Sequence, residues 1–233
     1  MAKGRTFRPP PWTGEFGWEV MSWAPWCRAQ SRAYARTEIV TFGASASLYA
    51  DFADRVTDHG GAGRSLQYPK DFGMYYSNRP GFEHVRYGRP VTGLDLVCHV
   101  RGIGRKAVIN WRRWGELAEL LVRAGLRFGV VGTPVDGMLP GAVDLRGVPL
   151  AGQMNAIAGS RLAVGVTSGT MHLAAACGTD LVVWGDTKTR YRETLEQRYK
   201  ETWNPHHVGV GWIDADDYDP SVDTVFDAIE NLL

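Results

Sequence analysis

Residues 165–185, GVTSGTMHLAAACGTDLVVWG, hold the pattern in this sequence that most clearly suggests chemistry. Between an apolar run and an alanine-rich run lie four small residues, Thr167, Ser168, Gly169 and Thr170. Small residues let a backbone approach a phosphate closely, and free N–H groups at a helix N-terminus favour an anion. Ser168 and Thr170 add hydroxyl donors, and a neutral His172 in the first turn can donate to a ligand oxygen. The stretch predicts a phosphate-binding loop, with an ordinary Ser or Thr helix cap as the alternative.

A second candidate segment, residues 99–114, is basic and follows an apolar run. It carries Arg101, Arg105 and Lys106. Cations at the carboxyl end of a strand suit a diphosphate. The GIGRKA part loosely fits the dinucleotide fingerprint, which requires a helix to begin at once and an acid about 20 residues on. Here VIN intervenes, so the segment predicts phosphate contacts and no nicotinamide cofactor.

Two further segments carry carboxylates. In TGEFGWE (13–19), Glu15 or Glu19 is a candidate general base that takes a proton from a hydroxyl. The alternative for Glu19 is compensation of a helix dipole in a first turn. The D-x-D in DADDYD (214–219) is of a type that binds divalent metals. We interpret it as an acidic loop ahead of a closing helix and predict no metal site.

Hydrophobic patterning places these motifs on an α/β framework. Short apolar runs predict strands at 94–100, 127–132, 161–166 and 180–185. Stripes at helical spacing predict helices at 114–126, 150–160, 170–178 and 221–233. Strands that alternate with helices of this length predict a parallel sheet with right-handed crossovers, hence a Rossmann-like unit.

The front half repeats the alternation over shorter segments. We expect a helix at 19–35 despite Pro25, a strand at 38–43 and a helix at 47–56. The segment RYGRPVTG (86–93) contains Gly and Pro and predicts a boundary between two domains. The sequence therefore predicts two small Rossmann-like domains, 1–92 and 93–233, that face each other across a cleft. The C-terminal helix is expected to pack either on the second domain or back on the first.

The charge and cysteine content limit which partners and which cellular compartment are expected. The net charge is +1, but residues 1–92 hold 12 Lys and Arg against 8 Asp and Glu. This imbalance predicts an anionic partner for the front half, with chance surface composition as the alternative. The three cysteines form no C-x-x-C pair, and no apolar run reaches the length of a membrane span. We expect a cytoplasmic protein, in the host cytoplasm if it is viral.

These segments, in this order, resemble glycosyltransferases of the GT-B fold, nearest to the heptosyltransferase-like group. The resemblance covers residues 94 to about 205 and is strongest over 165–185, where that group carries a DSGxxHLAAALG phosphate loop. GEFGWE is similar to the turn where such enzymes keep their base. Two departures stand out: Thr167 occupies the place of the usual Asp, and both halves are shorter than usual for this fold.

The resemblance implies an inverting, metal-independent transfer of a sugar from a nucleotide-sugar to an acceptor hydroxyl, with no cofactor besides the donor. The base is Glu15 by the Gly–acid pairing, or Glu19 by counting back from Pro25. The implied donor contacts are Arg101, Arg105, Lys106, Thr167, Ser168, Gly169, Thr170, His172, Asp186, Thr187 and Lys188.

The basic front half suggests an anionic acceptor, because the front domain of GT-B enzymes faces the acceptor. An acidic glycan is one option, and DNA with hydroxymethylated bases, as in viral DNA-glucosylating enzymes, is the other. Such DNA enzymes take the base out of its stack, and an exposed Trp12 or Trp18 would stack against it. Two alternatives remain: a non-catalytic nucleotide-sugar-binding module, and a sugar-nucleotide epimerase of related fold.

Overall fold

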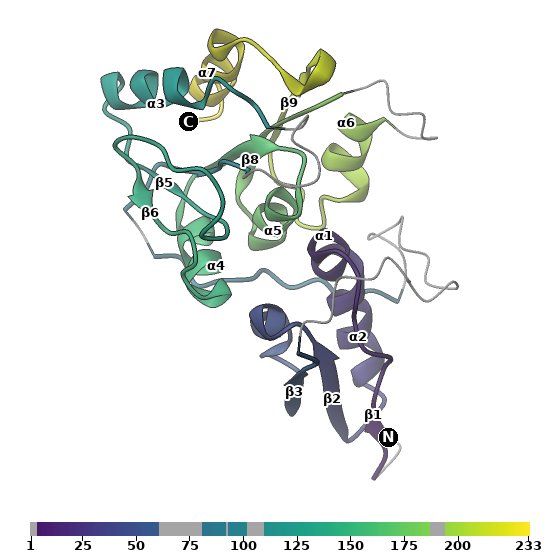
Figure 1. Cartoon of the computed structure of the whole chain (residues 1–233). Coiled ribbons are helices and arrows are strands. Elements are labelled where there is room, and N and C mark those ends of the chain that lie inside the picture. Colours follow the sequence, from purple (N-terminus) through teal and green to yellow (C-terminus); the bar gives the residue numbers. More distant parts are fainter. Residues whose placement is uncertain (1–3, 61–80, 92, 102–109, 187–193) are drawn as a thin grey trace. The chain divides into compact units, whose positions relative to one another are not determined.

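The computed structural model describes residues 4–60, 81–91, 93–101, 110–186 and 194–233 (Figure 1). The chain divides into two compact units, Met1–Val85 and Arg86–Leu233. Each unit is built on its own parallel sheet, of three strands in the first and six in the second. The predicted α/β class with two Rossmann-like units is confirmed. Within the described ranges, no helix is long and apolar enough to cross a membrane.

The sheet of the second unit is doubly wound. Its strands are β4 (Leu96–His99), β5 (Phe128–Val130), β6 (Val143–Asp144), β7 (Leu162–Val166), β8 (Asp180–Gly185) and β9 (Val210–Asp214). Their order in the sheet is β6-β5-β4-β7-β8-β9, and all neighbours are parallel. The chain thus winds outward in one direction from β4 and in the other from β7. Ligands of such sheets bind beyond the carboxyl ends of the strands at this switch point.

Helices cover both faces of this sheet. They are α3 (Trp114–Arg123), α4 (Leu150–Gly159), α5 (Gly169–Cys177), the short α6 (Leu195–Gln197) and α7 (Val222–Glu230). In Figure 1, α3 and α7 lie side by side on one face, and α4 and α5 lie on the other. Every strand and helix predicted for the second unit is present. The C-terminal helix α7 packs on its own unit, where Val225 and Ile229 are buried in the core.

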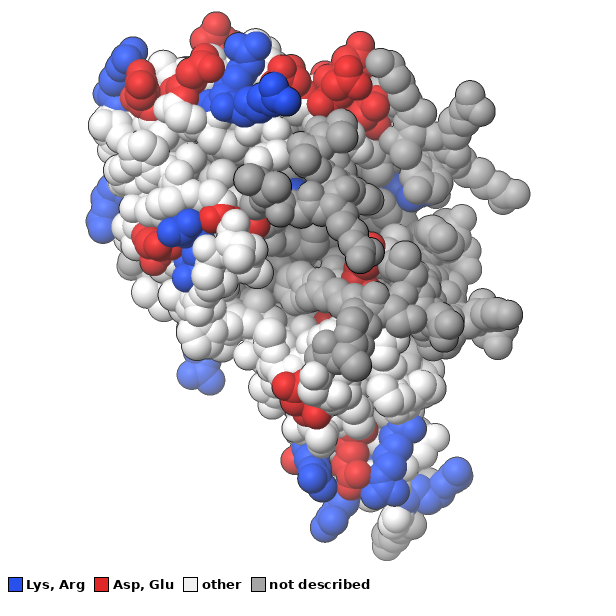
Figure 2. Space-filling view, in the orientation of Figure 1, with Lys and Arg blue, Asp and Glu red and all other residues white. Residues whose placement is uncertain are grey.

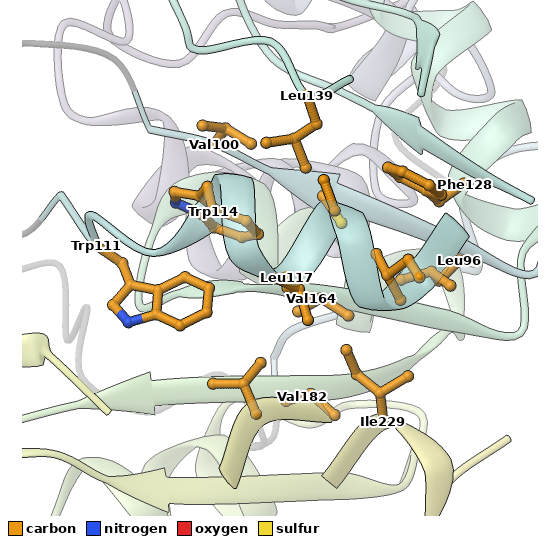
Figure 3. Close-up of a cluster of buried hydrophobic side chains, with 14 of the residues drawn as sticks. Leu96, Val100, Trp111, Trp114, Leu117, Phe128, Leu139, Val164, Val182 and Ile229 are labelled. Carbon is orange, nitrogen blue, oxygen red and sulfur yellow. The ribbon is translucent and has the colours of Figure 1, made fainter. Parts of the chain in front are cut away.

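The core between the sheet and the α3–α7 layer is rich in tryptophan (Figure 3). The indoles of Trp111, Trp114 and Trp184 meet with ring centroids 5.0–5.6 Å apart. Trp111 Nε1 donates to the Pro220 carbonyl oxygen at 2.9 Å, which ties the start of α3 to the start of α7. Leu117 points from α3 toward Val164 of the sheet and is fully buried.

The first unit contains β1 (Thr6–Phe7), β2 (Arg36–Thr41) and β3 (Arg55–Asp58), in the order β1-β2-β3. The predicted helix at 19–35 is present as one continuous helical segment. It comprises α1 (Phe16–Trp18), a π-helical turn (Glu19–Trp23) and α2 (Ala24–Ser31). Pro25 directly follows the π-helical turn, where the Ala24 N–H bonds the Glu19 carbonyl oxygen five residues back. The missing N–H of Pro25 therefore falls where the i→i−4 ladder is already interrupted.

The predicted helix at 47–56 is wrong. A 3₁₀ helix, Gly43–Tyr49, ends inside that range, and β3 begins at Arg55. Long-range pairing overrides the local pattern here: Val56 lies opposite Ile39 of β2, and the Asp54 carboxylate accepts the Thr37 N–H at 2.7 Å. Strands β1, β6 and β9 were not predicted. Strands that are this short or partly exposed show no clear alternation of apolar and polar residues.

The segment after Val85 belongs to the second unit. The Tyr87 N–H donates to the Ala176 carbonyl oxygen at 3.0 Å, and the Val91 N–H donates to that of Asn155 at 3.3 Å. Gly88 has φ +80°, and a Cβ there would lie 2.3 Å from the Met154 carbonyl oxygen. The unit boundary at Val85 therefore precedes the 92/93 boundary expected from the sequence.

Replacing Leu117 by Ala is expected to destabilise the second unit by about 2–5 kcal/mol, because the side chain is fully buried and its truncation leaves a cavity in the core. Urea unfolding measures the change. The matched control is Val122→Ala on the same helix, where the side chain is 55% exposed and a change within about 0.5 kcal/mol is expected. Equal effects of the two substitutions would contradict the assigned core.

Candidate functional site

The candidate site lies at the switch point, where the loop after β7 leads into α5. Ser168 caps the helix: its Oγ accepts the Met171 N–H at 3.4 Å. Its own N–H donates to the Tyr199 hydroxyl at 3.2 Å. The first N–H groups of a helix have no acceptor within the helix, and those of Gly169 and Thr170 belong to this first turn. The helix-cap interpretation is thus correct, and it is compatible with a phosphate site.

His99 is a site residue that sequence reasoning missed. It ends β4, and its Nδ1 lies 3.0 Å from Ser168 Oγ. Its Nε2 lies 3.9 Å from Asp136 Oδ2, and its side chain is only 9% exposed. Burial lowers the pKa of His99 to about 4, Asp136 opposes this shift, and Arg101 adds to it. The imidazole is therefore neutral at pH 7. The available signal was a histidine next to last in the near-continuous apolar run LDLVCHV (94–100).

His172, in the first turn of α5, belongs to an aromatic cluster. Its ring stacks on Tyr199 with centroids 5.0 Å apart and meets the edge of Trp203 at 4.9 Å. Tyr199 comes from a π-helical turn, Arg198–Thr202, that continues α6. Burial lowers the pKa of His172 to about 4, so this imidazole is also neutral at pH 7. Within the described residues, Nδ1 of His172 is buried and has no hydrogen-bond partner.

Three adjacent strands bring the predicted donor contacts to one edge of the sheet. Arg101 follows β4, Thr167 follows β7 and Asp186 follows β8, and all three side chains are half-buried. Thr167 is fixed by its N–H, which donates to the Trp184 carbonyl oxygen at 3.0 Å. The remaining predicted donor contacts lie outside the described residues: Arg105, Lys106, Thr187 and Lys188.

The two candidate bases, both in the first unit, occupy different surroundings. Glu19 is fully buried and accepts hydrogen bonds from the hydroxyls of Thr41 and Tyr49, the latter at 2.8 Å. Burial and the Glu19 charge raise the pKa of Tyr49 well above its usual value. Glu15 is exposed at the start of α1, with an extended backbone (φ −71°, ψ 147°). Exposure therefore favours Glu15 for proton exchange, whereas Glu19 has the contacts of a structural carboxylate.

The expected exposure of Trp12 is wrong. Its side chain is 1% exposed, because its indole stacks on Trp23 with centroids 5.3 Å apart. The backbone N–H of Trp12 donates to the Val40 carbonyl oxygen at 2.9 Å, which anchors the segment to β2. Trp18, at the end of α1, is half-buried.

Ion pairs within the first unit neutralise part of its excess positive charge. Arg8 pairs with Glu38 at 2.8 Å, buried Arg28 pairs with Asp51 at 2.7 Å, and Arg32 pairs with Glu83. Figure 2 shows basic and acidic side chains interspersed at the end of the first unit near β1 and β2. Net charge alone therefore overstates the basic character of this unit.

No protein-family model matches the chain, and no curated protein sequence matches it. Solved structures do. ADP-heptose LPS heptosyltransferase II of E. coli gives a TM-score of 0.64 at 12% identity over 97% of both chains. A family 9 glycosyl transferase from Veillonella parvula gives 0.62 at 13% identity over 97% of this chain and 95% of that one. E. coli heptosyltransferase WaaC, solved with ADP, gives 0.57 at 14% identity over 97% of both.

The class that these matches define is the GT-B fold of two parallel α/β domains. Within that class, the chain is structurally similar to the family 9 heptosyltransferases. The resemblance inferred from residues 94 to about 205 is thereby confirmed at the level of fold.

Lowering the pH from 7 toward 4 is expected to destabilise the second unit. The unfolded chain takes up protons at His99 and His172 near pH 6.5, whereas the folded chain does so only near pH 4. Each histidine therefore stabilises the fold above pH 6.5, and a contribution of up to roughly 3 kcal/mol is lost between these values.

Urea unfolding of the wild type and His172→Phe at pH 7.5, 6 and 5 measures this dependence. The variant is expected to lose less stability on acidification. His207→Asn is the control, because His207 is exposed, and it is expected to keep the wild-type slope. Identical slopes for all three proteins would contradict a neutral, buried His172.

Proposed function

We propose that this chain is a nucleotide-sugar-dependent glycosyltransferase that transfers a sugar to an acceptor hydroxyl with inversion and without a metal ion. The observation that carries the proposal is the capped N-terminus of α5 at the switch point of a doubly wound sheet, beside Arg101. The likeness of fold to family 9 heptosyltransferases supports it.

The donor diphosphate binds the N–H groups of Gly169 and Thr170 and the hydroxyl of Thr170 in this proposal. Arg101 adds charge, together with Arg105 and Lys106 of the basic segment. Asp186, Thr187 and Lys188 contact the sugar or the base. Because WaaC was solved with ADP, ADP-sugars are the first donors to test.

Glu15 acts as the base in the proposed reaction. It takes the proton of the acceptor hydroxyl while that oxygen attacks the anomeric carbon. The bond from the anomeric carbon to the diphosphate oxygen breaks, and the nucleoside diphosphate leaves with the electron pair. Arg101 and the loop amides stabilise the charge that develops on the diphosphate. The cationic side chains thus provide the charge stabilisation that a metal ion would otherwise supply.

The acceptor is proposed to be anionic, either an acidic glycan or DNA with hydroxymethylated bases. Trp18 is the remaining candidate for stacking on an extruded base, since Trp12 is buried. The local pairing of Arg8, Arg28 and Arg32 with carboxylates weakens the charge argument without assigning either acceptor.

Nucleoside diphosphate release from ADP-, UDP- and GDP-sugars is expected, and only when an acceptor is present. Each donor is paired with hydroxymethylpyrimidine DNA in one reaction and an acidic glycan mixture in the other. Release with DNA assigns a DNA glycosyltransferase, and release with glycan assigns a glycan acceptor. Donor binding without release from any pair would instead favour a non-catalytic module, and conversion of the donor without acceptor an epimerase.

Glu15→Gln is expected to lower kcat by about 100-fold or more and to leave the melting temperature unchanged, because it removes an exposed general base. Glu19→Gln is the matched comparison and is expected to lower the melting temperature, because the buried carboxylate accepts two hydroxyl hydrogen bonds. The reverse pattern would assign the base to Glu19.

A further inference from the structure

The strands on either side of the switch point are joined by side chains as well as by the backbone ladder. His99 of β4 lies opposite Gly165 of β7. The Nδ1 of its ring lies 3.0 Å from the Oγ of Ser168, the residue that caps α5. The contact joins residues 69 positions apart at the place where the proposed donor diphosphate binds. The mechanism proposed above gives His99 no role.

Hydrogen-bond directions in this cluster follow from the partners. Ser168 Oγ already accepts the Met171 N–H, so its own hydrogen is available for donation. The carboxylate of Asp136, 3.9 Å from Nε2, favours the tautomer with the hydrogen on Nε2. Nδ1 is then an acceptor for the Ser168 hydroxyl at 3.0 Å. One direction thus satisfies the hydrogen bonds that join His99, Ser168 and Met171, while Asp136 acts on Nε2 by its charge alone.

The His99 side chain is only 9% exposed and lies against two glycines. A Cβ at Gly132 would lie 3.3 Å from His99 Cδ2 and 2.6 Å from Asp136 Oδ2. A Cβ at Gly165 would lie 3.4 Å from His99 Cβ. Asp136 is itself held, because its Oδ2 accepts the N–H and the hydroxyl of Thr133 at 2.6 and 2.7 Å. The ring and its carboxylate are therefore preorganised.

We propose that His99 is a positioning residue for the donor loop: by accepting the Ser168 hydroxyl hydrogen it fixes the helix cap, which directs the N–H groups of Gly169 and Thr170 to the diphosphate. The inference rests on the proposed function. The proposal also gives the two hydroxyls different roles. The Ser168 hydroxyl donates its hydrogen to His99, whereas the Thr170 hydroxyl does not. Thr170, and not Ser168, is then the side chain that donates to the phosphate.

The array of Asp136, His99 and Ser168 has the residue types of a hydrolytic triad, but its geometry does not support that role. The 3.9 Å separation between Nε2 and Oδ2 is too long for a hydrogen bond, and Ser168 Oγ serves as a helix cap. Among the residues that the structure describes, Asp136 and Arg101 act on the imidazole by charge, and Tyr199 is reached through Ser168. These features suit orientation of a loop.

Calorimetric titration with ADP, UDP and GDP tests the proposal on the full chain. His99→Leu fills the site without an acceptor and is expected to weaken binding of the preferred diphosphate by about tenfold. His99→Asn places an amide oxygen where Nδ1 was and is expected to restore binding to within about threefold of wild type. Thr170→Ala is expected to weaken binding as well.

Thr179→Val is the matched control, because it removes another buried hydrogen bond of the same unit, from Thr179 Oγ1 to the Ile157 carbonyl oxygen at 2.8 Å. It is expected to lower the melting temperature without changing diphosphate affinity. Affinity that stays unchanged in His99→Leu, or that falls equally in Thr179→Val, would overturn the positioning role. A wild-type chain that binds none of the three diphosphates would overturn the proposed function itself.

Nitrogen chemical shifts of His99 in the wild type provide a readout that needs no variant to fold. The proposal requires a hydrogen on Nε2 and none on Nδ1 at pH 7. The opposite tautomer would overturn the proposal, because Nδ1 would then donate to Ser168 and could no longer hold its hydroxyl hydrogen.

Discussion

The parallel pairing of β4 with β7 is the constraint on which the second unit depends. The chain winds away from these two strands in opposite directions, so the segments that follow them diverge and leave their carboxyl ends uncovered by a crossover. The apolar runs of both strands are buried on both faces, which fixes their place in the sheet. Everything proposed for the donor follows from this geometry, because it sets Arg101, His99 and the start of α5 at one edge.

A second constraint acts inside the first unit, where a carboxylate is buried. Hydroxyls of Thr41 and Tyr49 donate to Glu19 and stabilise its buried carboxylate. These contacts tie the end of β2 and the 3₁₀ helix to the π-helical turn, in which the Ala24 N–H donates to the Glu19 carbonyl. One acid of GEFGWE is thereby held in the core, while Glu15 stays exposed at the start of the same helical segment. The two carboxylates can therefore serve different purposes.

Neutral, buried imidazoles distinguish the candidate site from a simple cationic phosphate site. His99 and His172 contribute hydrogen bonding and ring contacts at pH 7 and no charge. Among the described residues around His99 and Tyr199, positive charge comes from Arg101, and the helix N-terminus adds the partial charge of its first N–H groups. The cap of α5 thus depends on hydrogen bonds between uncharged groups that are partly buried.

The sequence by itself determined strands β4, β5, β7 and β8 of the second unit, helices α3, α4, α5 and α7, and the position of the small-residue loop before α5. These features are encoded in the local spacing of apolar residues and in the small residues Thr167–Thr170, which act within one or two turns of chain. Only the tertiary structure decided the strand at 55–58, the burial of Trp12, the distinction between Glu15 and Glu19, and the contact of His99 with Ser168. Each of these depends on which distant segments meet, β2 with β3 or β4 with the loop after β7, and no local pattern records such a meeting.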